Sequence, residues 1–336
     1  MRGGPTTRWA GAVGLLLVAD LVGLAVVGSS GAPGATRSDP CAGAVTPTAP
    51  ASVDLRATTQ NSLLVPVCID GKGPFHLVLD TGATNTAITP ALAHRLGLVP
   101  NGVGAKFLGV GRPQAGRPVR VDSWSMGRVR LLPQPVFVTS GLGGSDGLLG
   151  SDVLSRMGAI ELEYDTAELT VAGAEGPRAA RSVVRGRASA RLPAFIAAQQ
   201  PQATLPLVIA NFGGTAVASI PVTVGARRLN LELDSGAEAS TIRRSVAAGL
   251  QLRTEEDRAR IVGVGGTVTA ALERVDAWSA ESVRLVPQDV AVLDLPTFPG
   301  DPGPDGLLGS DVLSQFRVVA IDYRDAALAV EQVPVV

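Results

Sequence analysis

Several residue types are scarce in this chain of 336 residues, and each shortage counts against a class of protein. Two cysteines and two histidines are too few for a convincing zinc cluster, so no metal site is expected. The formal net charge of −1 gives no electrostatic reason to expect a nucleic acid partner. Aromatic residues make up only 4% of the chain, so Val, Leu, Ile and Ala must form most of any core.

The residues that are abundant indicate a folded, turn-rich protein. Hydrophobic residues make up 46% of the sequence, which supports a substantial core and counts against global disorder. The 40 glycines and 24 prolines are spread along the chain and indicate many tight turns between short strands. The length suffices for two domains of ordinary size.

Residues 1–35 are interpreted as a targeting segment. Arg2 and Arg8 precede an apolar stretch at 9–28 that only Asp20 interrupts. This pattern is typical of a cleaved signal peptide, and about 20 apolar residues could also form a retained N-terminal membrane anchor. Either alternative predicts export, as a secreted protein or one anchored to the extracytoplasmic face of a membrane. Residues 36–52, rich in small residues and proline, are expected to be a flexible tether.

The two cysteines are candidates for a single disulfide. An exported chain with an even number of cysteines favours a Cys41–Cys68 bond. The alternative is two unpaired thiols, with Cys68 an ordinary small core residue.

One aspartate-containing turn occurs twice. Asp80-Thr81-Gly82-Ala83 is repeated 154 positions later as Asp234-Ser235-Gly236-Ala237, and a ten-residue string at 146–155 recurs at 305–314. Further matched pairs, such as Trp124 and Trp278, are also 154 positions apart, which indicates a duplicated domain. The predicted organisation is an N-terminal lobe at 53–172, an Arg-rich linker at 173–203 and a C-terminal lobe at 204–333.

Each repeat has the pattern of a β-rich unit. Apolar segments at 63–69 and 75–79, joined by a Gly-rich turn, predict a hairpin that carries Asp80 at its end. Residues 220–224 and 229–233 repeat this arrangement before Asp234. Short helices are expected at 90–97 and 151–157, and strands at 160–164 and 168–171.

The repeated turn, a Gly-x-Gly hairpin tip and a following Leu-Leu-Gly together resemble the aspartic proteases. The resemblance is closest to retropepsin-like aspartic proteases, here with two retropepsin-type units in one chain, and it covers roughly residues 55–172 and 204–332. It implies an all-β, bilobal acid-protease fold with the active site between two homologous lobes.

The resemblance also implies roles for individual residues. Asp80 and Asp234 would form the catalytic dyad, since two close carboxylates share a proton and can act as general base and general acid toward a water. Gly82 and Gly236 would allow close backbone approach. Thr81 and Ser235 would brace the two loops against each other.

Two hairpin tips resemble flaps that hold an extended peptide like an added strand. They comprise Gly109, Val110 and Gly111 in the first lobe and Gly263, Val264 and Gly265 in the second. Thr84 in one repeat corresponds to Glu238 in the other, which makes the halves unequal and favours one fixed orientation of the peptide.

The predicted function is that of an aspartic endopeptidase acting on peptide or protein substrates, without cofactor and as a monomer. Two alternatives remain open. One is a catalytically silent peptide-binding module on the same fold. The other is a zymogen whose Arg-rich linker is cut. The repeated Asp146/Asp305, Asp152/Asp311 and Trp124/Trp278 pairs are interpreted as structural.

Overall fold

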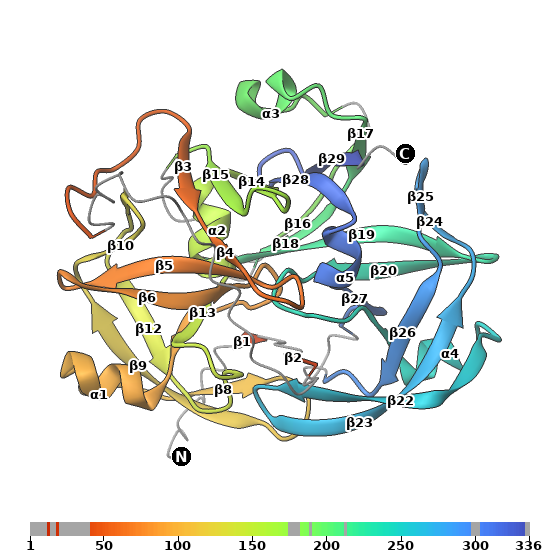
Figure 1. Cartoon of the computed structure of the whole chain (residues 1–336), viewed down its shortest axis with the longest axis horizontal. Coiled ribbons are helices and arrows are strands. Elements are labelled where there is room, and N and C mark those ends of the chain that lie inside the picture. Colours follow the sequence, from red (N-terminus) through yellow and green to blue (C-terminus); the bar gives the residue numbers. More distant parts are fainter. Residues whose placement is uncertain are drawn as a thin grey trace, which may run out of the picture.

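The computed structural model of the chain describes residues 12–13, 18–19, 41–173, 182–187, 190–211, 214–296 and 303–332. The described chain forms two β-rich lobes with a few short helices, and a further sheet is shared between the lobes (Figure 1). The expected all-β, bilobal fold is confirmed.

The N-terminal lobe is built on one large sheet. Its strands follow the spatial order β8-β9-β12-β7-β13-β6-β5-β10-β11, and β4 pairs with β5. The elements of this lobe are β3 (Ala51–Asp54), β4 (Arg56–Ala57), β5 (Leu63–Ile69), β6 (Lys72–Leu79), β7 (Ala87–Ile88), α1 (Pro90–Leu96), β8 (Ala105–Leu108), β9 (Gln114–Val121), β10 (Trp124–Met126), β11 (Val129–Arg130), β12 (Gln134–Val138), β13 (Gly147–Leu149), α2 (Ser151–Leu154), the 3-10 helix η1 (Ser155–Met157), β14 (Ala159–Glu163) and β15 (Glu168–Val171).

The C-terminal lobe repeats this arrangement on a second large sheet. Its order is β16-β18-β19-β20-β27-β21-β26-β23-β22, with β24 and β25 attached to β19. The elements are β16 (Ser182–Arg185), α3 (Ala194–Ala198), β17 (Ala203–Pro206), β18 (Val208–Asn211), β19 (Ala216–Val224), β20 (Arg227–Leu233), β21 (Thr241–Arg243), α4 (Arg244–Ala247), β22 (Arg253–Gly263), β23 (Gly266–Val275), β24 (Trp278–Ala280), β25 (Val283–Leu285), β26 (Gln288–Leu293), β27 (Gly306–Leu308), α5 (Ser310–Leu313), β28 (Phe316–Asp322) and β29 (Ala327–Gln332).

The hairpin before each aspartate forms as the sequence predicts. In β5 and β6, alternate side chains enter the core, and β6 pairs antiparallel with β5 before the chain reaches Asp80. β19 and β20 form the equivalent pair before Asp234. The expected helix after the first turn is α1. The Thr89 side chain caps its first turn, and Gly97 ends it in the left-handed conformation at φ 74°.

A six-stranded antiparallel sheet joins the two lobes. Its order is β17-β29-β28-β14-β15-β3, so three strands come from each repeat. The two central strands, β14 and β28, pair in register from Ala159↔Asp322 to Glu163↔Val318. Because the three strands of one repeat continue into the three of the other through the β14–β28 pair, the lobes are joined by one continuous sheet.

Two segments expected to be loose make ordered contacts. In the predicted tether at 36–52, Val45 lies in a parallel bridge with Val129, and β3 already begins at Ala51. In the predicted linker at 173–203, β16 pairs with β18 and extends the C-terminal sheet. Parts of both segments are therefore held by backbone pairing, which the side-chain pattern did not indicate.

Most of the predicted targeting segment at 1–35 lies outside the described residues. Two short pieces are described as strands, β1 (Ala12–Val13) and β2 (Val18–Ala19). β1 pairs parallel with β8, and β2 pairs antiparallel with β22. Among the described residues, no helix has the length and apolar character needed to cross a membrane.

Candidate active site

The two repeated aspartates lie where the lobes meet, each at the end of a core strand. Asp80 follows β6 and its amide donates to the Leu149 carbonyl at 3.0 Å. Asp234 follows β20 and its amide donates to the Leu308 carbonyl at the same distance. Both aspartates are 0% exposed. The Leu-Leu-Gly segments therefore hold the two loops from below, as their sequence pattern suggested.

The two loops are locked together by a symmetrical set of hydrogen bonds. The Thr81 hydroxyl donates to the Leu233 carbonyl at 2.7 Å and accepts from the Ser235 amide at 3.0 Å. The Ser235 hydroxyl donates to the Leu79 carbonyl at 2.7 Å and accepts from the Thr81 amide at 3.2 Å. Each hydroxyl thus bridges to the opposite lobe, which fixes the spacing of the aspartates.

The glycines of the two turns allow the carboxyl groups to approach the opposite loop. A methyl group on Gly82 would lie 2.6 Å from Cγ of Asp234, and one on Gly236 would lie 2.6 Å from Cγ of Asp80. Both distances are far below van der Waals contact. Each loop backbone is therefore packed directly against the carboxyl group that the other loop carries.

The carboxyl groups are arranged to share a proton. Oδ1 of Asp80 accepts from the amides of Ala83 at 2.7 Å and Gly82 at 3.0 Å, and Oδ1 of Asp234 accepts from the amides of Ala237 at 3.0 Å and Gly236 at 3.1 Å. The remaining oxygens, Oδ2 of each group, are buried, and the two side chains interact electrostatically with each other. Two buried carboxyl groups in such contact cannot both be ionised at low cost.

The pair is nevertheless electrostatically unequal. Burial raises the pKa of Asp80 to about 7, although the loop amides and the bond to Asp234 favour its ionised form. Burial raises the pKa of Asp234 well above its usual range, and the negative charges of Asp80 and Glu232 raise it further. Ionisation of one carboxyl group therefore opposes ionisation of the other, and the two titrate as a pair.

Asp152 and Asp311, which the sequence indicated only as structural residues, support the two loops from the adjacent layer. Asp152 accepts hydrogen bonds from the Thr86 hydroxyl at 2.7 Å and from Nε2 of Gln134 at 2.9 Å. Asp311 accepts the corresponding bonds from the Ser240 hydroxyl at 2.7 Å and from Nε2 of Gln288 at 2.6 Å. Both carboxylates therefore brace neighbouring segments, and Asp311 also accepts from the Val312 amide of its own helix at 3.0 Å.

The two Gly-x-Gly segments lie at hairpin tips that touch each other. Gly111 forms a parallel bridge with Gly265, and the Arg112 amide donates to the Gly265 carbonyl at 2.8 Å. The tip between β8 and β9 thus meets the tip between β22 and β23. The structure brings the predicted flap residues together in this closed arrangement.

Each tip places a valine among the apolar residues of the opposite lobe. Val264, 0% exposed, belongs to an N-side cluster, and Val110, 1% exposed, belongs to a C-side cluster. The N-side cluster comprises Val78, Ala83, Ala87, Ala105, Phe107, Leu142, Leu148 and Val264. The C-side cluster comprises Val110, Ala237, Ile261, Ala270, Ala291, Leu293, Leu295 and Leu307. Because Ala83 and Ala237 directly follow the aspartate turns, these clusters adjoin the dyad.

Other residues singled out by the sequence lie outside this site. Cys41 and Cys68 form a disulfide with Cα atoms 5.5 Å apart. Asp146 accepts from the His76 amide, and Asp305 accepts from the Asn230 amide. Among the described residues, no group of three or more potential ligands could hold a metal ion.

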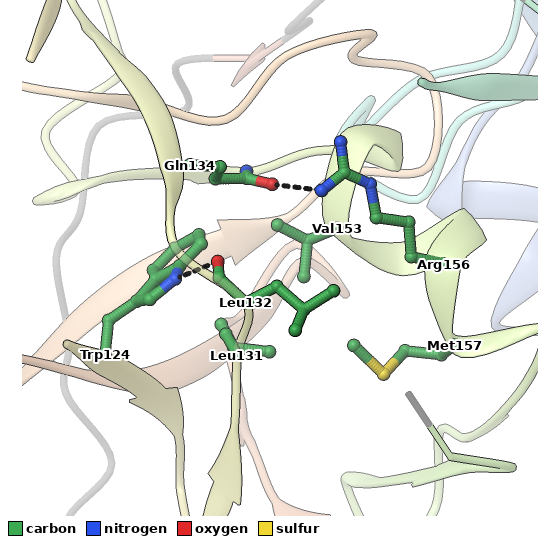
Figure 2. A pocket seen from close by; sticks show the side chains of 7 residues that line it. All are labelled: Trp124, Leu131, Leu132, Gln134, Val153, Arg156 and Met157. Atoms are coloured by element: carbon green, nitrogen blue, oxygen red, sulfur yellow. Dashed lines mark hydrogen bonds between the residues drawn. The ribbon is translucent and has the colours of Figure 1, made fainter. Parts of the chain in front are cut away.

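The Trp124 side chain lines a small cavity in the N-terminal lobe (Figure 2). The cavity volume is about 10 Å³, which is large enough for at most one water. The indole N–H of Trp124 donates to the Leu132 carbonyl at 2.8 Å, and Trp278 makes the matching bond to Val286 at 2.8 Å. Both tryptophans are therefore core residues with satisfied donors.

The sequence interpretation missed Glu232. This residue is 6% exposed and stands two positions before Asp234, where the first repeat has Val78. The signal was present in the alternation of β20, because an acid interrupts a strand end that is otherwise buried and apolar.

The family described as Aspartyl protease matches the chain at residues 65–153 and again at 220–312. No curated protein matches the chain.

Two solved structures illustrate the likeness. An aspartic proteinase from Irpex lacteus is 15% identical, with 85% of this chain and 98% of that chain covered at a TM-score of 0.46. A retropepsin-like aspartic protease from Rickettsia conorii is 18% identical, with 39% of this chain and 97% of that chain covered at a TM-score of 0.28.

The two family matches together span more than half of the chain and each contains one aspartate turn. The chain therefore belongs to the aspartyl protease family and carries two units of it in tandem.

Proposed function

We propose that this protein is an aspartic endopeptidase that hydrolyses peptide bonds through the Asp80–Asp234 dyad and one water. The observation that carries the proposal is the pair of fully buried, proton-sharing carboxyl groups that two repeated loops bring into contact. A pair of this kind supplies a base and an acid at the same point, which amide hydrolysis requires.

In the proposed mechanism the pair carries one proton, which we place on Asp234. Asp80, as carboxylate, takes a proton from the water while the water oxygen bonds to the scissile carbonyl carbon. Asp234 gives its proton to the carbonyl oxygen, which yields a neutral diol. Asp80 then passes its proton to the amide nitrogen as the C–N bond breaks, and Asp234 recovers a proton from a diol hydroxyl. The products are a carboxylic acid and an amine.

The flap hairpins support binding of an extended segment. β8 and β22 each pair with a strand of their own hairpin on one edge and with a short strand of the N-terminal segment, β1 or β2, on the other. Both short strands lie between the lobes (Figure 1). The outer edge of each flap strand therefore accepts an extended backbone segment, and a substrate peptide that displaces β1 or β2 would pair there in the same way, as in strand addition.

Cleavage of a peptide library by the wild-type chain and by Asp80→Asn tests this function. The expected result is cleavage that the substitution abolishes and that an inhibitor mimicking the tetrahedral diol blocks. Binding of peptides without cleavage would contradict the proposal and favour a silent peptide-binding module.

We also propose that the chain acts as an exported monomer. The Cys41–Cys68 disulfide suits an oxidising compartment, and one chain supplies both aspartates. Fusing residues 1–40 to a reporter that is active only after export tests the location, and sedimentation of the protein tests its oligomeric state. A reporter retained in the cytoplasm, or a site that forms only in a dimer, would contradict this proposal.

A further inference from the structure

The two sides of the site differ most clearly at Glu232. Strand pairing sets the direction of its side chain, because Glu232 pairs with Leu307 of β27 while its neighbours pair with Gly306 and Leu308. Paired residues point to the same face of a sheet. Leu307 belongs to the C-side cluster, so Glu232 faces that cluster, next to the dyad and beneath the flap tips.

The first repeat has an apolar residue at the same place. Val78 pairs with Leu148, and both belong to the N-side cluster. The residue across the hairpin is also apolar in the first repeat and polar in the second, since Leu64 lies opposite Val78 whereas Ser219 lies opposite Glu232. The N side of the site is therefore walled by aliphatic groups, and the C side has an acid and a hydroxyl in their place.

A second acid distinguishes the two repeats near the dyad. Glu238 follows Asp234 by four positions, where the first repeat has Thr84. Its Oε1 accepts from the hydroxyl of Ser62 at 3.3 Å, and Ser62 belongs to the opposite lobe. Glu238 therefore reaches toward the N-terminal lobe, and Glu232 is the acid that faces the C-side cluster.

We propose that Glu232 makes the C side of the site selective for a cationic side chain, lysine or arginine, at one of the two substrate residues that flank the scissile bond. The inference rests on the proposed peptidase function. A carboxylate in a low-dielectric wall attracts a cation more strongly than it would in water and repels an anion. The aliphatic stem of lysine or arginine can pack against Ile261 and Leu307 while its head reaches Glu232.

The C side also has smaller side chains at a matched position. Phe137, which packs against the N-side cluster, corresponds to Ala291 in the C-side cluster. The C side, with Ala291 in place of a phenylalanine, therefore lacks one aromatic ring that the N side has. A long side chain is therefore better accommodated on the C side than on the N side, which agrees with the preference inferred from the charge.

The test uses peptides that the wild-type chain cleaves, varied at one residue on either side of the scissile bond. Lysine is compared with norleucine, which is uncharged and of similar length, and with glutamate. The expected ratio of kcat/KM for lysine over norleucine is roughly 10 or more on one side of the bond only, expressed mainly in KM. Glutamate at that side is expected to be cleaved least.

Two substitutions connect the preference to this residue. Glu232→Gln keeps the size of the side chain and Glu232→Val copies the first repeat, and both are expected to bring the ratio near 1. Adding Val78→Glu to Glu232→Val is expected to move the lysine preference to the other side of the scissile bond. Glu161→Gln, which alters a buried acid in the six-stranded sheet, is the matched control and is expected to keep the wild-type ratio.

The outcomes separate this inference from the proposed function. Equal cleavage of lysine and norleucine peptides by the wild-type chain would overturn the inference and leave the peptidase function standing. A lysine preference retained in both Glu232→Gln and Glu232→Val would do the same. Failure of the wild-type chain to cleave any peptide would overturn the proposed function itself.

Discussion

The two aspartate turns depend on the absence of a Cβ atom at Gly82 and at Gly236. A single added methyl group at Gly82 or Gly236 would collide with the carboxyl group of the opposite loop. The hydroxyls of Thr81 and Ser235 hold this contact from both sides. At the residue scale, the spacing of the two carboxyl groups is therefore set by backbone packing and not by the aspartate side chains alone.

Gly236→Ala tests that dependence. The new methyl group would lie 2.6 Å from Cγ of Asp80 and must displace it. Since a displacement of about 1 Å at a reacting group can cost roughly 100-fold in rate, kcat/KM is expected to fall by about that factor or more. Steady-state kinetics on a cleaved peptide measure the loss.

Gly225→Ala is the matched control for that substitution. Gly225 has a φ of +57° and no heavy atom within 4 Å of the added methyl group. The Gly225→Ala variant should lose about 1 kcal/mol of folding stability through backbone strain and keep its catalytic activity. Equal kinetic losses in the two variants would contradict a specific role for the Gly236 contact.

The raised pKa of Asp80 predicts the acid limb of the pH profile. Asp80 must be ionised to accept a proton from water, and burial raises its pKa to about 7. Activity is therefore expected to fall as the pH drops through the near-neutral range, because Asp80 becomes protonated there. The pH dependence of kcat/KM measures this limb. An acid limb near pH 4, the range of an ordinary aspartate, would contradict the assignment.

At the scale of elements, the two flap hairpins are joined to each other at their tips. Their tips form the Gly111–Gly265 bridge, and each tip valine packs among residues of the other lobe. A substrate must therefore separate the tips before it can reach the dyad. The energy needed to release Val110 and Val264 from their clusters contributes to the cost of opening.

Gly265→Ala is expected to loosen this closure. The added methyl group would lie 2.5 Å from the Val110 carbonyl oxygen and would also collide with Arg112. The Arg112 amide, which donates to the Gly265 carbonyl, should exchange its hydrogen faster, and KM should rise several-fold. Hydrogen exchange and steady-state kinetics measure the two effects. Thr267→Ala, an exposed change in the same hairpin, should alter neither, and unchanged exchange at Arg112 in Gly265→Ala would contradict the contact.

At the scale of the whole molecule, the disulfide ties the segment that begins at Cys41 to the first lobe. Cys41 and Cys68 are 27 positions apart, and closing a loop of that length corresponds to about 3.5 kcal/mol of lost unfolded-state entropy. Replacing both cysteines by serine should lower the free energy of unfolding by about that amount. Denaturant unfolding without reductant measures it, and an unchanged midpoint would contradict a stabilising bond.

The sequence predicted the parts of the fold that carry a repeated pattern. The aspartate hairpins, α1 with its end at Gly97, and the placement of Asp80 and Asp234 between the repeats follow from alternation, helix-end residues and the spacing of the repeat. These features depend on local side-chain chemistry, which a sequence displays directly.

The parts that the sequence did not predict depend on long-range backbone pairing. β16 joins the C-terminal sheet from a stretch that lacks apolar alternation, and the bridge at Val45 orders a segment rich in small residues. The bracing role of Asp152 also required the structure, since Thr86 and Gln134 approach it from other strands. No local pattern marks partners that are distant along the chain.

The most direct test of the central claim is a double-mutant cycle on the two aspartates. Asp80→Asn, Asp234→Asn and the double variant are compared with the wild-type chain on one peptide, with each fold checked by its unfolding transition. If the carboxyl groups act as one dyad, each single substitution should lower kcat by about 1,000-fold or more, and the double variant should be no worse than either. Losses that multiply, or a single variant that keeps its activity, would contradict a shared catalytic pair.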